Sequence, residues 1–120
     1  MRNQNEHNEQ VALFQWAKMA EGKYPELALL FSIPNGGARH IAVARKLKAE
    51  GVKAGVPDIC LSAPRGIYHG FFIEMKSGKN KPTAIQLEWH ERLRTSGYRV
   101  EVCHNWSLAK MYIEEYLGAE

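Results

Sequence analysis

Two apolar segments in the middle of the chain, residues 58–61 and 70–76, are close enough in sequence to pair as a hairpin. The loop between them, residues 63–68, contains Pro64 and Gly66, which favour a turn between strands. The other two predicted strands, residues 27–33 and 98–103, are separated from this hairpin by helical segments. A helical connection between strands favours a crossover, which makes a parallel pair. The pattern predicts an α/β fold with a mixed four-stranded sheet and helices on both faces.

Four helices are expected, over residues 6–21, 39–50, 83–96 and 107–117. Thr83 and Gln86 have the spacing of a capping box at the start of the third helix. Ser107 is the predicted N-cap of the last helix, and Gly51 follows the second helix as its C′ residue. The predicted order of elements is therefore α-β-α-β-β-α-β-α.

The composition is that of an ordinary globular domain, with 120 residues, 45% hydrophobic and 24% charged. One domain spanning residues 1–120 is expected. The chain has no apolar stretch long enough for a transmembrane helix and no signal-peptide pattern at its N-terminus, which predicts a cytoplasmic protein without a membrane partner. Cys60 and Cys103 lie in apolar runs without metal-ligand spacing, so both are predicted to be buried, reduced thiols.

Three charged residues lie within or next to the apolar strands of the predicted hairpin. Asp58 begins the first strand, and Glu74 and Lys76 lie near the end of the second. Because side chains alternate along a strand, Glu74 and Lys76 share a face, roughly 7 Å apart at the backbone. Two carboxylates suffice to hold Mg²⁺, which prefers oxygen ligands and keeps several waters. The Met75 backbone carbonyl is a candidate third ligand. The pattern indicates a metal site for phosphodiester hydrolysis, with Lys76 as base or electrostatic clamp.

Simpler interpretations exist for the same residues. Asp58 could cap a turn after Pro57, and Glu74 and Lys76 could form an ion pair on a solvated strand face. Glu9 shares the apolar face of the first helix with Leu13, where a carboxylate needs a partner.

The residues in this order resemble the PD-(D/E)xK nuclease superfamily, with Pro57-Asp58 and Glu74-Met75-Lys76 as its two signature segments. More narrowly, the chain resembles the VRR-NUC (virus-type replication-repair nuclease) domain, through the segments 34–37, 50–58, 70–76 and 97–98 together with Glu9, Gln86 and Trp89. The resemblance implies that Glu9, or Glu6 one turn earlier, contributes an acidic group to the site and that Gln86 takes part in it. It also implies a Mg²⁺ or Mn²⁺ cofactor and a DNA substrate.

Positive charge is concentrated in two stretches, although the net charge is only +3. Such clusters can neutralise backbone phosphates, and a glycine-rich turn can bring backbone N–H groups to a phosphate. The expected DNA-contacting residues are Asn35, Gly36, Arg39, Arg45, Lys46, Lys48, Lys79 and Lys81. A plain surface role for the same side chains stays open at this point.

Stand-alone members of the family resemble Holliday-junction resolvases that act as homodimers. The resemblance therefore favours a structure-selective endonuclease that cuts branched or four-way DNA. A flap- or end-processing nuclease is the alternative within the enzyme class. A non-catalytic DNA-binding module on the same fold is the alternative outside it. A restriction-like enzyme that reads sequence ranks low, because so short a chain leaves little room for elements that contact bases.

Overall fold

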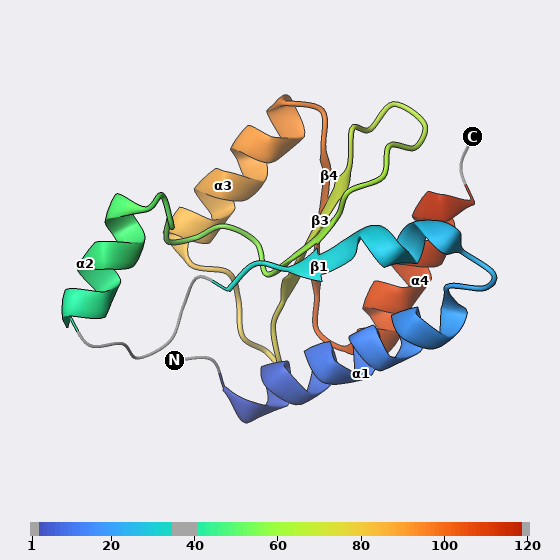
Figure 1. The fold of residues 1–120 in the computed structure, drawn as a ribbon, viewed down its shortest axis with the longest axis horizontal. Helices are drawn as coiled ribbons and strands as arrows, with labels where there is room; N and C mark the ends of the chain where they lie inside the picture. Colours follow the sequence, from blue (N-terminus) through green and yellow to red (C-terminus); the bar gives the residue numbers. More distant parts are fainter. Residues whose placement is uncertain (1–2, 35–40, 119–120) are drawn as a thin grey trace.

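The computed structural model describes residues 3–34 and 41–118. Within them the chain forms four α-helices, one 3₁₀ helix and four strands (Figure 1). In chain order these are α1 (Gln4–Ala20), η1 (Pro25–Leu29), β1 (Leu30–Ser32), α2 (Ile41–Ala49), β2 (Ile59–Leu61), β3 (Phe71–Met75), α3 (Ala84–Thr95), β4 (Arg99–Cys103) and α4 (Trp106–Leu117).

The four strands form one mixed sheet in the order β1-β2-β3-β4. β1 pairs with β2 and β2 with β3 in antiparallel fashion, whereas β3 and β4 are parallel. The register places Ile59 opposite Ile73 and Met75 opposite Cys103. The hairpin of β2 and β3 and the helical crossover from β3 to β4 are both as predicted. Because β3 and β4 are parallel, their C-terminal ends lie side by side, and Lys76 is the first residue after β3.

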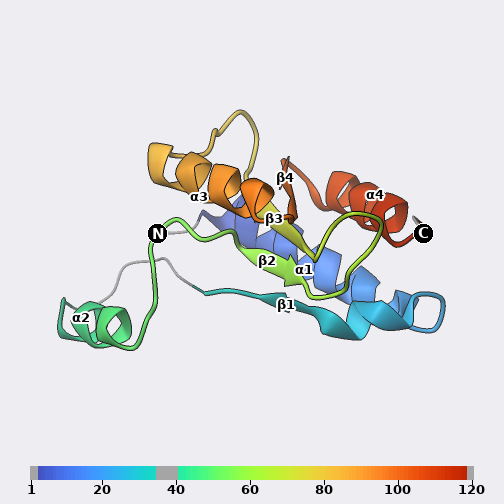
Figure 2. The same cartoon turned by 90° about the horizontal axis from the view of Figure 1, so that it is seen from above.

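Helices cover both faces of this sheet, which confirms the predicted architecture (Figure 2). Phe71, Ile73 and Met75 are fully buried in the hydrophobic core, which also contains residues from α1 and α4. The side chain of Glu74 points to the opposite face because side chains alternate along a strand. There it contacts α3. The apolar core and the charged face of β3 therefore lie on opposite sides of the same strand.

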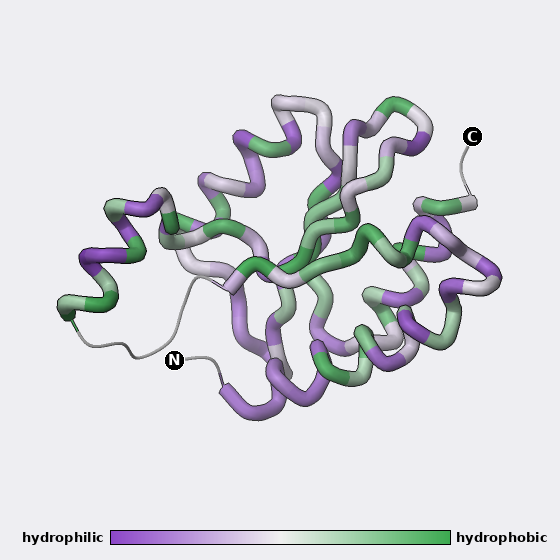
Figure 3. The backbone as a smooth tube through the Cα atoms, in the orientation of Figure 1, coloured by the Kyte–Doolittle hydropathy of each residue, from purple (hydrophilic) through white to green (hydrophobic). Residues whose placement is uncertain are grey.

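Apolar residues are concentrated in the strands at the centre of the molecule, and α2 lies apart from them (Figure 3). α2 projects from one end of the fold, and none of its residues is buried. Its basic residues Arg45, Lys46 and Lys48 are exposed. Gly51 ends the helix region with a φ of 102°, in the left-handed conformation expected of a C′ glycine.

Two local predictions were wrong. Residues 27–33 do not form one strand, because Pro25 starts a 3₁₀ turn that runs to Leu29 and leaves only Leu30–Ser32 extended. The N-cap of α4 is Asn105 and not Ser107. Asn105 is extended, with a φ of −158°, and its Oδ1 accepts from the N–H of Leu108 at 2.8 Å. A residue in helical conformation such as Ser107 cannot make this contact, since an N-cap must lie outside the helix.

The two cysteines are buried and free, as predicted. Burial raises the pKa of the Cys60 thiol, and it raises that of Cys103 to about 12. Among the described residues, no helix combines the length and apolarity that a membrane span requires.

Candidate active site

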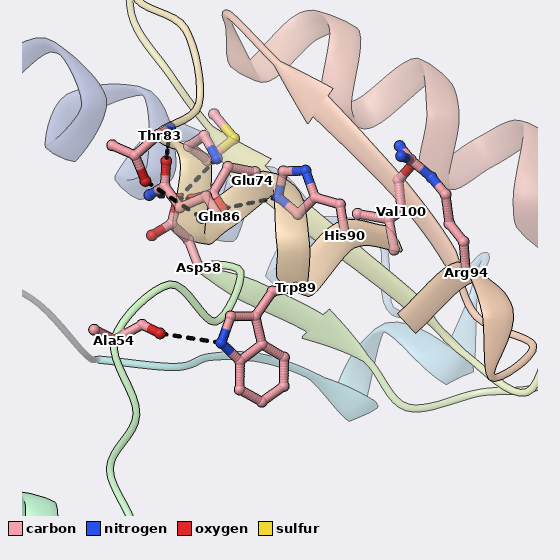
Figure 4. Close-up of polar contacts among 10 residues, drawn as sticks. Ala54, Asp58, Glu74, Thr83, Gln86, Trp89, His90, Arg94 and Val100 are labelled. Atoms are coloured by element: carbon pink, nitrogen blue, oxygen red, sulfur yellow. Dashed lines mark hydrogen bonds and ion pairs between the residues drawn. The ribbon is translucent and has the colours of Figure 1, made fainter. Parts of the chain in front are cut away.

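Asp58 lies directly before β2 and joins three strands. Its backbone carbonyl accepts from the N–H of Ile33, which follows β1, at 2.7 Å. Its carboxylate oxygen Oδ2 accepts from the N–H of Met75 in β3 at 2.8 Å. Because Met75 follows Glu74 in the chain, this contact brings the Asp58 carboxylate next to the backbone that carries Glu74 (Figure 4). The two carboxylates predicted to act together are thus held by one strand pair.

The segment that leads into Asp58 is fixed against α3. The indole N–H of Trp89 donates to the carbonyl of Ala54 at 3.0 Å. Gly55 has a φ of 90°, and a Cβ there would lie 2.9 Å from Cδ1 of Trp89. Only glycine permits both this backbone conformation and this approach. Trp89 is half-buried, and its hydrogen bond anchors the segment before Asp58.

Glu74 is almost completely buried, with 1% of its side chain exposed. The interpretation of Glu74 and Lys76 as an ion pair on a solvated face is therefore wrong for Glu74. Gln86 in α3 approaches it, with Nε2 of Gln86 3.5 Å from Oε2 of Glu74. The orientation of the Gln86 amide follows from the predicted capping box, since Oε1 accepts from the N–H of Thr83 at 2.9 Å. Gln86 therefore caps its helix and faces the carboxylate at the same time.

Sequence reasoning left His90 unassigned, yet it is a direct neighbour of Glu74. Its Nε2 lies 3.1 Å from Oε1 of Glu74, and 1% of the residue is exposed. Burial is the main cause that lowers the pKa of His90. The charges of Arg94 and Lys76 lower the pKa further, whereas that of Asp58 opposes them. The Nε2–Oε1 contact thus joins two buried groups, and the causes that lower the pKa of His90 outweigh the charge of Asp58. The spacing of four residues from Gln86, on one helix face, was the signal in the sequence.

Lys76 lies just beyond β3 and continues the parallel pairing, since its N–H donates to the carbonyl of Cys103 at 3.0 Å. Its side chain is half-buried. The charge of Lys76 acts on the imidazole of His90, and so does that of Asp58. Lys76 thus lies directly after the strand that carries Glu74.

Glu9 lies on α1 and contacts the start of α4. Its Oε1 accepts from the N–H of Trp106 at 3.0 Å. This contact provides the partner that a carboxylate on an apolar helix face requires, because the N-terminus of a helix attracts negative charge. Trp106 comes three residues after the end of β4, so Glu9 lies on the side of the sheet where β3 and β4 end. The predicted role of Glu9 in the active site stays a prediction.

Glu6, the alternative acidic residue, lies in the first turn of α1. Asn3 caps this helix, and its side-chain amide contacts both Oε2 of Glu6, at 3.1 Å, and the hydroxyl of Ser77, at 2.9 Å. Ser77 follows Lys76 directly, so the first turn of α1 also borders the end of β3.

The donor set fits magnesium or manganese better than a metal that needs a closed protein site. In residues 3–34 and 41–118, no group of three or more His, Cys, Asp or Glu side chains is placed to hold an ion. A pair of carboxylates is nevertheless what Mg²⁺ uses when waters and substrate phosphates complete its shell. Carboxylate oxygens have several lone-pair directions, so contacts such as those with Met75, His90 and Gln86 are compatible with a cation on the same carboxylates.

The predicted DNA-contacting residues lie in two places. Lys79 and Lys81 are exposed in the loop after β3, beside the candidate site. Arg45, Lys46 and Lys48 are on the projecting helix α2. Asn35, Gly36 and Arg39 lie outside the described residues.

Comparison with known proteins identifies the family of this chain. The family model of the VRR-NUC domain matches residues 2–106. A solved structure described as a VRR_NUC domain protein is 30% identical, with a TM-score of 0.80 over 97% of this chain and 90% of the other. A second, described as a VRR_NUC domain, is 26% identical, with a TM-score of 0.52 over 90% of this chain and 97% of the other. No curated protein sequence matches. The chain belongs to the VRR-NUC family of nuclease domains.

Proposed function

We propose that this nuclease domain is a Mg²⁺- or Mn²⁺-dependent endonuclease that cuts branched DNA, as a homodimer of the Holliday-junction resolvase kind. The observation that carries the proposal is the hydrogen bond of 2.8 Å from Met75 N–H to Asp58 Oδ2. It holds one acidic residue beside the strand that carries the second acidic residue and leads to Lys76.

Asp58, Glu74 and the Met75 carbonyl would hold the metal ion in this proposal. A bound divalent ion supplies Lewis-acid stabilisation of the charge that develops on the phosphate and makes water more acidic. The protein contributes position: Asp58 is fixed by the backbone of Met75, and Glu74 is fixed by α3. Lys76 is the cation nearest in sequence to this acidic pair, and it stabilises the phosphate or takes a proton from the attacking water.

Selectivity for branched DNA would come from the separation of the basic residues. Lys79 and Lys81 lie beside the site, whereas Arg45, Lys46 and Lys48 lie on α2, which projects from the fold. Phosphate contacts position a protein without reading sequence. Two basic regions at different places can therefore engage two arms of a junction. Leu29 and Phe31 at the β1 edge are each 49% exposed and offer an apolar surface to a second copy.

The test is cleavage of an end-labelled four-way junction in Mg²⁺ or Mn²⁺, with linear duplex, flap and single-stranded DNA of matched sequence as controls. Paired, symmetric cuts on the junction are expected, with little cutting of linear duplex. Cuts confined to flaps or ends would favour the flap- or end-processing alternative. Salt-sensitive junction binding without cleavage under any condition would favour the non-catalytic module.

Glu9 offers a test of the acidic contribution from α1. The Glu9→Gln variant keeps an amide oxygen that can accept from Trp106 N–H, so its melting temperature is expected to stay near that of the wild type. Cleavage is expected to fall by about 10-fold to 100-fold, the usual effect of losing a group that supports a metal site. Glu6→Gln is the matched control from the same helix. Normal cleavage by Glu9→Gln, with a loss in Glu6→Gln, would transfer the role to Glu6.

A further inference from the structure

Among the described residues, His90 has a partner at one ring nitrogen and none at the other. Its Nε2 lies 3.1 Å from Oε1 of Glu74, and its Nδ1 is buried without a hydrogen-bond partner among the described residues. An ionised carboxylate only accepts hydrogen bonds, so Nε2 is the ring nitrogen that donates to Glu74 when Glu74 is ionised. Figure 4 shows the imidazole of His90 directed at the carboxylate of Glu74.

Packing alone does not explain a histidine at this place. A buried ring nitrogen without a partner is unfavourable, and an apolar side chain of similar size would fill the space between α3 and β3 without that cost. What histidine adds is a donor on a rigid ring, at a fixed distance from one carboxylate oxygen. Gln86, one turn earlier on the same face of α3, approaches the other oxygen of Glu74 at 3.5 Å. The two α3 side chains thus define the plane and the rotation of the carboxylate.

We propose that His90 is a positioning residue, which holds the Glu74 carboxylate in the orientation that accepts the divalent cation. The proposal rests on the proposed function, in which Glu74 is a metal ligand. Hydrogen-bond partners of metal ligands commonly matter in this way, because a ligand that rotates freely must be ordered again on each binding event. His90 itself is not expected to contact the metal or the DNA.

Three substitutions separate the donor from the volume of the ring. In His90→Gln the amide nitrogen can occupy the place of Nε2 and donate to Glu74. In His90→Asn the amide is one bond shorter and matches the position of Nδ1, so it cannot reach Oε1. His90→Leu fills much of the space with no donor at all. Far-UV circular dichroism and the melting temperature in EDTA report whether each variant folds.

The primary measurement is the rise in melting temperature with Mn²⁺ concentration, which reports binding without catalysis. The half-saturating Mn²⁺ concentration for junction cleavage is measured alongside it. Each measurement gives a Mn²⁺ midpoint, the concentration at which half of the effect is reached. We expect both Mn²⁺ midpoints to increase by about 10-fold to 100-fold in His90→Leu and His90→Asn. His90→Gln should restore them toward the wild type. A purely structural histidine would lower the melting temperature in EDTA and leave both Mn²⁺ midpoints unchanged.

Two results would overturn the proposal. The first is a wild-type Mn²⁺ midpoint in folded His90→Leu or His90→Asn. The second is a folded His90→Gln that binds Mn²⁺ as poorly as His90→Leu, because the donor would then not be what matters. The wild-type protein distinguishes these from a failure of the proposed function. If the wild type gains no stability from Mn²⁺ and cuts no DNA, the metal site itself is absent and the role of His90 fails with it.

Discussion

Asp58→Asn is expected to remove the gain in thermal stability that Mn²⁺ or Mg²⁺ gives the wild-type protein. The substitution keeps an oxygen that can accept from Met75 N–H, so the local fold is retained, but it removes the negative charge. At ten times the dissociation constant, binding to the folded state stabilises the wild type by about 1.4 kcal/mol. For a domain of this size that corresponds to roughly 5 °C in melting temperature. The measurement is a thermal melt with and without metal.

Glu88→Gln is the matched control for this experiment. Glu88 is an exposed carboxylate on α3 that pairs with Arg92, so its loss should leave the metal effect intact. Asp58→Asn should also reduce cleavage to background at a metal concentration that saturates the wild type. An unchanged stability gain in Asp58→Asn would show that the ion binds elsewhere, and it would remove the main support for the proposed site.

Lys76→Ala is expected to lower the rate of cleavage by roughly 10²-fold to 10⁴-fold while DNA binding changes little. Losses of this size follow the removal of a general base or of a group that stabilises charge in the transition state. The residue is half-buried and directly follows the strand that carries Glu74, which suits a role in the reaction better than long-range attraction of DNA. Single-turnover cleavage of the junction gives the rate, and fluorescence anisotropy in EDTA gives the affinity.

Lys79→Ala is the control for charge, because Lys79 is an exposed lysine in the loop that follows. Its loss should weaken DNA binding and reduce the salt dependence of the affinity by about one phosphate contact. The cleavage rate of DNA that is already bound should stay unchanged. Lys76→Arg separates the two roles that remain open for Lys76. Arginine stays protonated and cannot act as a base, so activity retained in this variant would indicate an electrostatic clamp. If Lys76→Ala and Lys79→Ala behave alike, Lys76 has no special role in the reaction.

The capping box of Thr83 and Gln86 was predicted correctly because every contact in it lies within one helical turn. The mixed sheet was also predictable, since hairpin and crossover follow from loop length. The N-cap of α4 was predicted two residues too late, because Asn105 and Ser107 are both good capping residues and only the backbone conformation selects between them. No role was predicted for His90, because its partner Glu74 lies on another element, β3. The sequence of β3 alone does not show that α3 buries Glu74.

The sequence by itself determined the order of the elements, the alternation that separates Glu74 from the apolar core, and the family to which the residues point. These properties depend on the spacing of residues along the chain and on local chemistry. Only the tertiary structure decided that Asp58 binds the backbone of Met75, that α3 contributes His90 as well as Gln86, and that Glu9 contacts the start of α4. Such contacts join segments far apart in sequence, and their distances are set by how helices pack on the sheet.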